Sequence, residues 1–196
     1  MLSLEQGKKL VQAARKAVTS KIEEKHFELE GFREPSGVFV TIHGYPGNEL
    51  RGCIGFPEPI FPLNRALVQA ARAAAFSDPR FRPLQKEDLD NVIFEVSILT
   101  KPELIKVKKS EDYKKEIEIG KDGLVAECEG YRGLLLPQVA PEHSMDQEEF
   151  LCCTCEKAGL SSEAWKDVKS VRIYKFQTQI FKETEPNGEV TETKDF

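Results

Sequence analysis

The sequence predicts an α+β fold in which helices flank a mostly antiparallel sheet. Its first 26 residues have helical spacing, with apolar side chains at Leu10, Val11, Ala14 and Val18. Strand-forming segments then occur in pairs joined by short turns, which is typical of antiparallel hairpins. Helices and strands follow one another in a mixed order rather than in strict βαβ alternation, which favours α+β over a parallel α/β fold.

Local signals place the individual elements. Ser3 and Gln6 have the spacing of a capping box, so the first helix should begin there and run to about residue 26. Residues 36–43 and 49–56 predict a hairpin around the turn Tyr45-Pro46-Gly47-Asn48. The other expected elements are helices over 64–76, 86–91, a short stretch after 110, 145–158 and 161–165, and strands over 92–99, 123–127, 131–136 and 171–182.

Length and composition indicate one domain. The chain has 196 residues, of which 40% are hydrophobic and 31% charged, a balance typical of globular proteins. We expect this domain to span residues 1–183. Residues 184–196 form a polar C-terminal segment that is either a flexible tail or a late hairpin.

The charge and the apolar runs exclude some classes of partner. The net charge of −5 argues against nucleic-acid binding, which usually needs a basic surface. No apolar run approaches the ~20 residues of a membrane-spanning helix, and no secretory signal pattern is visible. We therefore expect a cytoplasmic protein whose five cysteines are reduced thiols.

The most informative motif is Leu50-Arg51-Gly52-Cys53-Ile54-Gly55. In a strand, Arg51 and Cys53 would project from the same face, and a guanidinium beside a thiol favours the thiolate. Cys53 is thus the candidate nucleophile and Arg51 a candidate ligand-binding residue. Gly52 and Gly55 would allow another backbone or a ligand to approach closely. The competing interpretation is that Cys53 is a small buried apolar residue.

Glu95 and Ser97 lie on one face of an otherwise apolar predicted strand. A carboxylate there needs a partner, because an isolated buried charge is costly. Both residues are candidates for orienting the catalytic groups. A purely structural Arg51–Glu95 ion pair explains the same pattern.

The loop Asp78-Pro79-Arg80-Phe81 is a second constellation. Asp78 and Arg80 could be presented toward a ligand while Phe81 anchors the loop. Equally, Asp78 could cap a backbone turn and form a salt bridge with Arg80.

Metal and cofactor signals are weak. Cys152 and Cys155 would share a helix face, but no second Cys/His pair has zinc-ligand spacing, so we predict core thiols and no metal site. His143 could act as a base near Cys53, although a lone loop histidine is more often a bystander. Nucleotide-binding and hydrolase motifs are absent from the sequence, and we expect no cofactor.

Taken in order, these motifs resemble the AMMECR-type domain family, named from a human candidate gene for Alport syndrome with midface hypoplasia, intellectual disability and elliptocytosis. The resemblance covers the chain from about Ser3 to Glu183. The motifs that carry it are Leu50 to Gly55, Glu58-Pro59, Asp78 to Phe81, Glu95 to Thr100, Ile119 to Leu124, Gly133 to Val139, Glu149 to Leu151 and Cys155 to Leu160.

The resemblance implies larger and smaller lobes with a cleft between them, and a functional site at the Arg51-Gly52-Cys53 signature. It adds Gln138, within the Gly133 to Val139 motif, to the candidate ligand-binding residues. In prokaryotes such domains occur beside Memo-like and radical-SAM proteins, which implies a shared pathway. Two hypotheses follow: an enzyme that acts on a small anionic ligand through Cys53, or a non-catalytic interaction module for those proteins.

Overall fold

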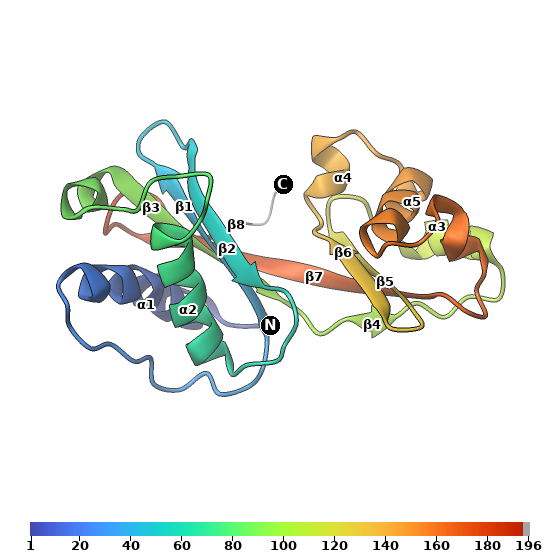
Figure 1. Ribbon diagram of the computed structural model, residues 1–196, viewed down its shortest axis with the longest axis horizontal. Helices are drawn as coiled ribbons and strands as arrows, with labels where there is room; N and C mark the ends of the chain where they lie inside the picture. Colours follow the sequence, from blue (N-terminus) through green and yellow to red (C-terminus); the bar gives the residue numbers. More distant parts are fainter. Residues whose placement is uncertain (194–196) are drawn as a thin grey trace. The chain divides into compact units, whose positions relative to one another are not determined.

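The computed structural model describes residues 1–193 (Figure 1). The chain divides into two compact units. The first contains residues 1–99 together with the described residues from Gln179 onward, and the second contains residues 100–178. The predicted α+β fold class is confirmed, because the strand pairings of both units are antiparallel and helices pack on the strands.

The first unit is built from helices α1 (Leu4–Ile22) and α2 (Leu63–Phe76), the 3-10 helix η1 (Lys86–Asn91) and a sheet. Its strands are β1 (Gly37–Gly44), β2 (Leu50–Phe56), β3 (Val92–Leu99), the end of β7 (Arg172–Glu183) and β8 (Val190–Thr193). The strand order is β2-β1-β3-β7, with β8 also paired to β7. Strand β2 therefore ends this order, with β1 as its neighbour.

Helix α1 begins where the sequence predicts, at a capping box in which Ser3 and Gln6 satisfy each other's backbone N–H groups. It ends at Ile22, four residues before the predicted end. Glu24 adopts a left-handed conformation with φ 55°. A right-handed α-helix cannot continue through such a residue, so the helix ends before it.

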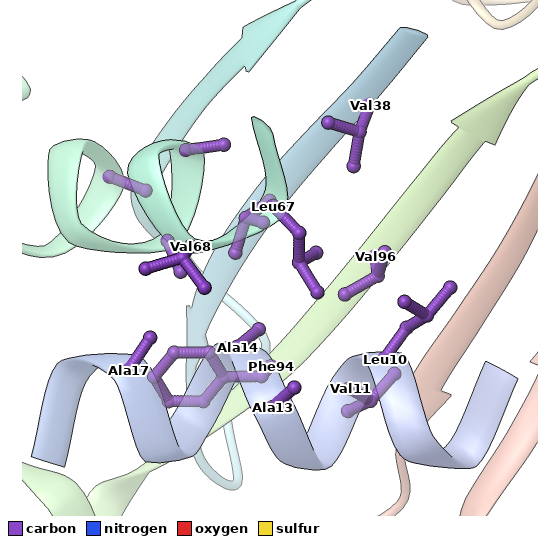
Figure 2. Packing of buried hydrophobic residues seen from close by; sticks show 14 of the residues in the cluster. Leu10, Val11, Ala13, Ala14, Ala17, Val38, Leu67, Val68, Phe94 and Val96 are labelled. Atoms are coloured by element: carbon purple, nitrogen blue, oxygen red, sulfur yellow. The ribbon is translucent and has the colours of Figure 1, made fainter. Parts of the chain in front are cut away.

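The core of the first unit lies between the two helices and one face of the sheet. Figure 2 shows side chains of α1 and α2 meeting those of β1 and β3, among them Leu10, Leu67, Val38, Phe94 and Val96. Alternate strand residues therefore face the helices. Polar side chains of the same strands, including Thr41 and Glu95, occupy the other face.

A buried ion pair joins α1 to the end of β7. Arg15 donates to both carboxylate oxygens of Glu183, at 2.7 and 2.6 Å, and also to the carbonyl oxygens of Leu89 and Val92. Glu183 in turn accepts the N–H of Phe94 at 2.9 Å. Every member of this network has a hydrogen-bonded partner, which is the condition under which buried charges are tolerated.

The second unit contains β4 (Glu103–Leu104), η2 (Ser110–Asp112), α3 (Tyr113–Glu116), β5 (Asp122–Cys128), β6 (Tyr131–Leu135), α4 (Val139–Glu142), α5 (Gln147–Lys157) and η3 (Ser162–Lys166). Strand β5 pairs with β6 and with the first part of β7. A separate apolar core forms around Phe150, Leu151, Trp165 and Ile173. Strand β4 and helix α4 were not predicted, because two- and four-residue elements leave almost no periodic signal.

The polar C-terminal segment forms the hairpin alternative over its described part. Val190 is buried, and β8 pairs antiparallel with Ile180–Glu183 of β7. Residues 194–196, the remainder of the predicted tail, lie outside the described residues. Within residues 1–193, no helix is both long and apolar enough to cross a bilayer.

Candidate functional site

Cys53, Thr41 and Glu95 form one row across three neighbouring strands. The register pairs Thr41 of β1 with Cys53 of β2 on one side and with Glu95 of β3 on the other. Paired residues of adjacent strands point to the same face, so the three side chains project together. This face, opposite the helices, is called the polar face below.

The thiol of Cys53 is half-buried and hydrogen-bonded. The hydroxyl of Thr41 lies 3.3 Å from Sγ and is placed to donate to it. Burial raises the pKa of Cys53, and this outweighs the opposing effects of the Thr41 hydroxyl and the charge of Arg80. The expectation of a lowered thiol pKa beside Arg51 is therefore wrong: the pKa is raised, the cation that acts on the thiol is Arg80 rather than Arg51, and the charges of Glu95 and Asp78 add to the effect of burial.

Asp78 and Arg80 hold the backbone of Cys53. The Asp78 carboxylate accepts the Cys53 N–H at 2.9 Å, and Arg80 Nη2 reaches the Cys53 carbonyl oxygen at 3.3 Å. The same carboxylate also binds the Nε, Nη2 and backbone N–H of Arg80. These bonds, led by Arg80, hold the pKa of Asp78 well below its usual range.

The two members of this clamp differ in exposure. The side chain of Asp78 is 2% exposed and that of Arg80 is 54% exposed. Asp78 is a predicted ligand contact; in the structure its carboxylate accepts four hydrogen bonds, one from the Cys53 N–H and three from Arg80, and so holds the Cys53 backbone. The alternative of an aspartate that caps a turn and pairs with arginine is the one observed. Arg80 still presents part of its guanidinium outward.

The side chain of Arg51 contacts the loop that follows helix α2. The pairing of β1 and β2 shifts between Ile42 and His43, so Arg51 has no partner in the register. Its Nη2 donates to the carbonyl oxygen of Arg82 at 2.7 Å, and its guanidinium lies 5.9 Å from the centre of the Phe81 ring. Arg80 lies over the same ring at 5.4 Å. The alternative of an Arg51–Glu95 ion pair is wrong.

Glu95 has two other cationic neighbours. Its Oε2 lies 3.3 Å from Nε2 of His43 and 3.4 Å from Nζ of Lys182 on β7. Burial alone would raise the pKa of Glu95, but His43 and Lys182 together keep it below its ordinary value. Lys182 also donates to the side chain of Asn48 at 2.7 Å. The polar face thus holds a carboxylate in its charged form.

His43 lies two residues from Thr41 on β1 and shares its face. The contact of Nε2 with Glu95 has the length of an ion pair but not the alignment of a hydrogen bond. Both ring nitrogens are buried and have no hydrogen-bond partner within residues 1–193. Buried polar atoms without partners are uncommon in folded proteins and are expected where a ligand or water completes the site.

The two glycines of the signature allow close packing. A Cβ on Gly52 would lie 2.2 Å from the carbonyl oxygen of Ala74, so this glycine lets β2 approach helix α2. A Cβ on Gly55 would collide with the Phe39 ring. Both glycines therefore serve backbone or side-chain approach. Ser97 lies on the polar face in the next row, paired with Phe39.

The remaining predicted residues lie in the second unit. Gln138 precedes α4, and its Oε1 is buried without a hydrogen-bond partner in the described chain. His143 lines a pocket of about 590 Å³ that also includes Cys152 and Cys153. Cys155 is fully buried, which confirms the prediction of a core thiol there, whereas Cys152 is only half-buried and lines the pocket. No cluster of three or more His, Cys, Asp or Glu side chains over residues 1–193 is arranged to hold a metal ion.

Thr41, His43 and Lys182 belong to the site although no motif pointed to them. Thr41 and His43 have the alternation of a strand whose second face is polar, which was the available signal. Lys182 reaches the site through the pairing of distant strands, and that pairing leaves no local trace in the sequence.

Comparison with known proteins gives a consistent result. The AMMECR1 family model matches residues 11–181. Protein MJ0810 of Methanocaldococcus jannaschii is 50% identical over 198 residues, covering 99% of this chain and 98% of the relative. Protein Ta0236 of Thermoplasma acidophilum is 48% identical, covering 96% of this chain and 93% of the relative.

A solved structure matches as well. The crystal structure of uncharacterized protein PH0010 from Pyrococcus horikoshii superposes with a TM-score of 0.80 at 43% identity, covering 96% of this chain and 97% of that one. The family model, the sequence relatives and the solved structure therefore agree with one another. This chain belongs to the AMMECR1 family.

Proposed function

We propose that this protein is a cytosolic, cysteine-dependent enzyme that modifies a small anionic substrate at the polar face. One observation carries the proposal: the thiol of Cys53 shares this face with the imidazole of His43, whose two buried nitrogens have no hydrogen-bond partner among residues 1–193. A thiol and an unsatisfied imidazole on neighbouring strands are the components of nucleophilic catalysis.

In this proposal the base is His43, which lies on the same face as Cys53 and two residues along β1 from Thr41, the strand partner of Cys53. Because the pKa of Cys53 is raised, little thiolate exists at neutral pH, and a neighbouring base must remove the proton. Glu95 contacts His43 through Nε2 and would stabilise the imidazolium once it forms. Thr41 donates to Sγ and would stabilise the developing thiolate in the same step.

Arg51 and Arg80 form the anion-binding part of the site. Both guanidinium groups lie over the Phe81 ring, and the charge of Arg80 acts on the Cys53 thiol. Arg80 forms an ion pair with Asp78, whereas over residues 1–193 the Arg51 guanidinium has no ion-pair contact of its own, although its charge also acts on Asp88. Arg51 is therefore the arginine that we assign to a carboxylate or phosphate on the substrate.

The chemistry follows from these assignments. Sγ of Cys53 attacks an electrophilic carbon of the substrate, and the thiol proton passes to His43. The bond from that carbon to its leaving group breaks, and His43 returns the proton to the leaving group. A substrate fragment remains bound to sulfur until water or a second substrate releases it.

Activated esters test this reaction class on the full-length protein. The probes are p-nitrophenyl esters that match in size, one with a terminal carboxylate and one without, and intact-protein mass spectrometry follows the adduct. We expect an adduct at Cys53 that forms faster with the anionic ester. His43→Gln should slow it about 100-fold, the low end of a general base's contribution.

Matched variants separate the roles. Arg51→Gln should remove the preference for the anionic ester while leaving the neutral ester's rate largely intact. Cys153→Ser, which removes a half-buried thiol of the second unit, is the control and should behave like the wild-type protein. Equal labelling of Cys53 in the wild-type protein and in His43→Gln would refute the assignment of His43 as the base.

An interaction module is the second candidate, favoured by apolar exposure after β2. Ile60 is 72% exposed and Phe61 is 42% exposed, in a short loop that contains Pro57 and Pro59. Contiguous exposed apolar side chains can form a docking surface, and these two are adjacent in the sequence and follow the signature strand. A Memo-like or radical-SAM protein is the partner that the family resemblance implies.

Capture by immobilised protein distinguishes the two candidates. If the module function holds, a purified Memo-like or radical-SAM protein is retained by the wild-type chain and lost with Ile60→Asp combined with Phe61→Asp. Leu104→Asp, at an apolar residue of the second unit that is as exposed as Phe61, is the control. If neither partner protein is retained by the wild-type chain and the ester adduct forms at Cys53, the results support the enzyme and not the interaction module.

A further inference from the structure

A second polar depression lies in the first unit, away from the row of Cys53, Thr41 and Glu95. It encloses about 1150 Å³ between helix α2 and the segment of residues 26–33 that follows α1. Its charged lining comes from three arginines, one histidine and two glutamates, namely Arg33, Arg65, Arg72, His26, Glu28 and Glu30. This depression is called the α2 groove.

Helical periodicity builds one wall of the α2 groove. Arg65, Gln69 and Arg72 are spaced four and three residues apart, so they form a stripe along α2. The core residues of α2, including Leu67 and Ala71, lie on the opposite side of the helix and pack in the core. The groove and the polar face are therefore on different sides of the helix layer.

The other wall is fixed by hydrogen bonds rather than by regular secondary structure. Asn64 donates from its side chain to the Leu29 carbonyl oxygen at 3.0 Å and from its backbone to Phe32 at 3.0 Å. The N–H of Leu63 reaches the Glu34 carbonyl oxygen at 3.1 Å. Residues 29–34 are thus attached to the start of α2, so hydrogen bonds within the protein hold the two walls together.

The arginines of the groove lack acidic partners. Over residues 1–193, none of Arg33, Arg65 and Arg72 forms an ion pair with a carboxylate, and Arg72 uses only its Nε, toward the Ala17 carbonyl oxygen at 3.3 Å. Glu28 is already close to His26, at 3.5 Å. In a protein with a net charge of −5, this is a local excess of unpaired guanidinium groups.

The spacing of the arginines points to an elongated anion. Arg65 and Arg72 are seven residues apart, which is about 10 Å along a helix axis. A single phosphate or carboxylate would contact both only if the two side chains leaned toward one point, whereas an extended peptide covers that distance in about three residues and can place one acidic group at each arginine. Gln69, between them, can bond to a peptide backbone. We propose that the α2 groove binds an extended acidic peptide segment of a partner protein.

A peptide fits the lining better than a nucleic acid does. Glu28 and Glu30 lie in the groove among the arginines. A nucleic-acid backbone carries a charge at every nucleotide and would meet these carboxylates. A peptide can leave neutral residues opposite the glutamates and place its acids opposite the arginines, where carboxylates bind guanidinium groups in pairs of hydrogen bonds.

Fluorescence anisotropy with full-length protein tests the proposal. The probe is a labelled ten-residue peptide with alternating Glu and Gly, and its comparison is the same peptide with Gln in place of Glu. We expect saturable binding of the acidic peptide and at least tenfold weaker binding of the Gln peptide. Arg65→Glu combined with Arg72→Glu should weaken binding of the acidic peptide at least tenfold.

The control is Lys9→Glu combined with Lys86→Glu, which changes the net charge equally at exposed lysines outside the groove. Circular dichroism melts confirm that both double variants fold. If the control variant binds the acidic peptide as weakly as the groove variant does, the binding depends on net charge rather than on the α2 groove. That result would overturn the proposal. Displacement of the peptide by pyrophosphate or by a ten-nucleotide oligo-dT at lower concentration than by unlabelled peptide would also overturn it.

Discussion

Cys53 in the first unit and Cys155 in the second unit differ in the groups that surround the sulfur atom. Cys53 sits on a strand, where Thr41 donates to Sγ and the charge of Arg80 opposes the effect of burial on its pKa. Cys155 sits on α5 in the apolar core of the second unit, and burial raises its pKa to about 11. Both pKa values are raised, so burial alone does not identify a functional thiol. The difference lies in the polar groups that can act on it.

The largest expected effect concerns the packing that protects the thiols of α5. Trp165 is almost fully buried, and its Nε1 donates to Sγ of Cys152 at 3.4 Å. Trp165→Ala should lower the free energy of unfolding by about 3–5 kcal/mol, and Trp165→Phe by much less. Denaturant unfolding followed by circular dichroism measures this. We expect the Trp165→Ala variant to label faster at Cys155 but not at Cys53. Equal acceleration at both cysteines would contradict the view that their surroundings are independent.

The next effect concerns the clamp on Cys53. Asp78→Asn removes the charge that Arg80 and the Cys53 N–H bind, and should cost about 2 kcal/mol, as for hydrogen bonds to charged groups. Hydrogen exchange at the Cys53 amide should accelerate in this variant. Cys155, which has no such clamp, is the internal reference and should keep its protection.

The same clamp has a defined pH dependence. The pKa of Asp78 is lowered by folding, so its contribution to stability is complete above about pH 4, the ordinary aspartate range, and is lost as the pH falls further. Unfolding measured from pH 6 to pH 2 should therefore show a smaller acid loss in Asp78→Asn than in the wild-type protein. If the free energy of unfolding fell equally with pH in both proteins, Asp78 would not be the group responsible for the acid loss.

A smaller effect concerns the hydrogen bond to the thiol. Thr41→Val keeps the shape of the side chain but removes the donor, so the pKa of Cys53 should rise further. A net hydrogen bond of about 1 kcal/mol corresponds to about a fivefold lower thiolate fraction. Iodoacetamide labelling rates between pH 7 and 10 measure it, with Thr41→Ser as the control that keeps the hydroxyl.

The smallest effect is expected at Cys153. Burial is the main cause of its raised pKa, and the charge of Glu156 adds to it. Glu156→Gln should raise the labelling rate of Cys153 by less than about twofold at low salt, and not at high salt, because exposed charges are screened. A large change in the labelling rate would mean that the charge of Glu156, rather than burial, determines the pKa of Cys153.

The sequence predicts much of the fold and the position of the site. The capping box at Ser3, the hairpin around residues 45–48 and the strand Val92–Leu99 all depend on local patterns, and the structure confirms them. The partners of Arg51 and Glu95 could not be predicted. A shift in strand register redirects Arg51, and the neighbours of Glu95 come from β1 and β7, which are distant in the sequence.

The discontinuity of the first unit determines when it can finish folding. Arg15 requires Glu183, and Gly7 is shaped to accept the buried ring of Phe181, so both ends of the chain must be present. A buried arginine without its counter-charge costs about 3–5 kcal/mol. During synthesis, residues 100–178 can therefore form their own core first. Helices α1 and α2 are synthesised earlier, but their unit is complete only after the end of β7 and β8 have left the ribosome.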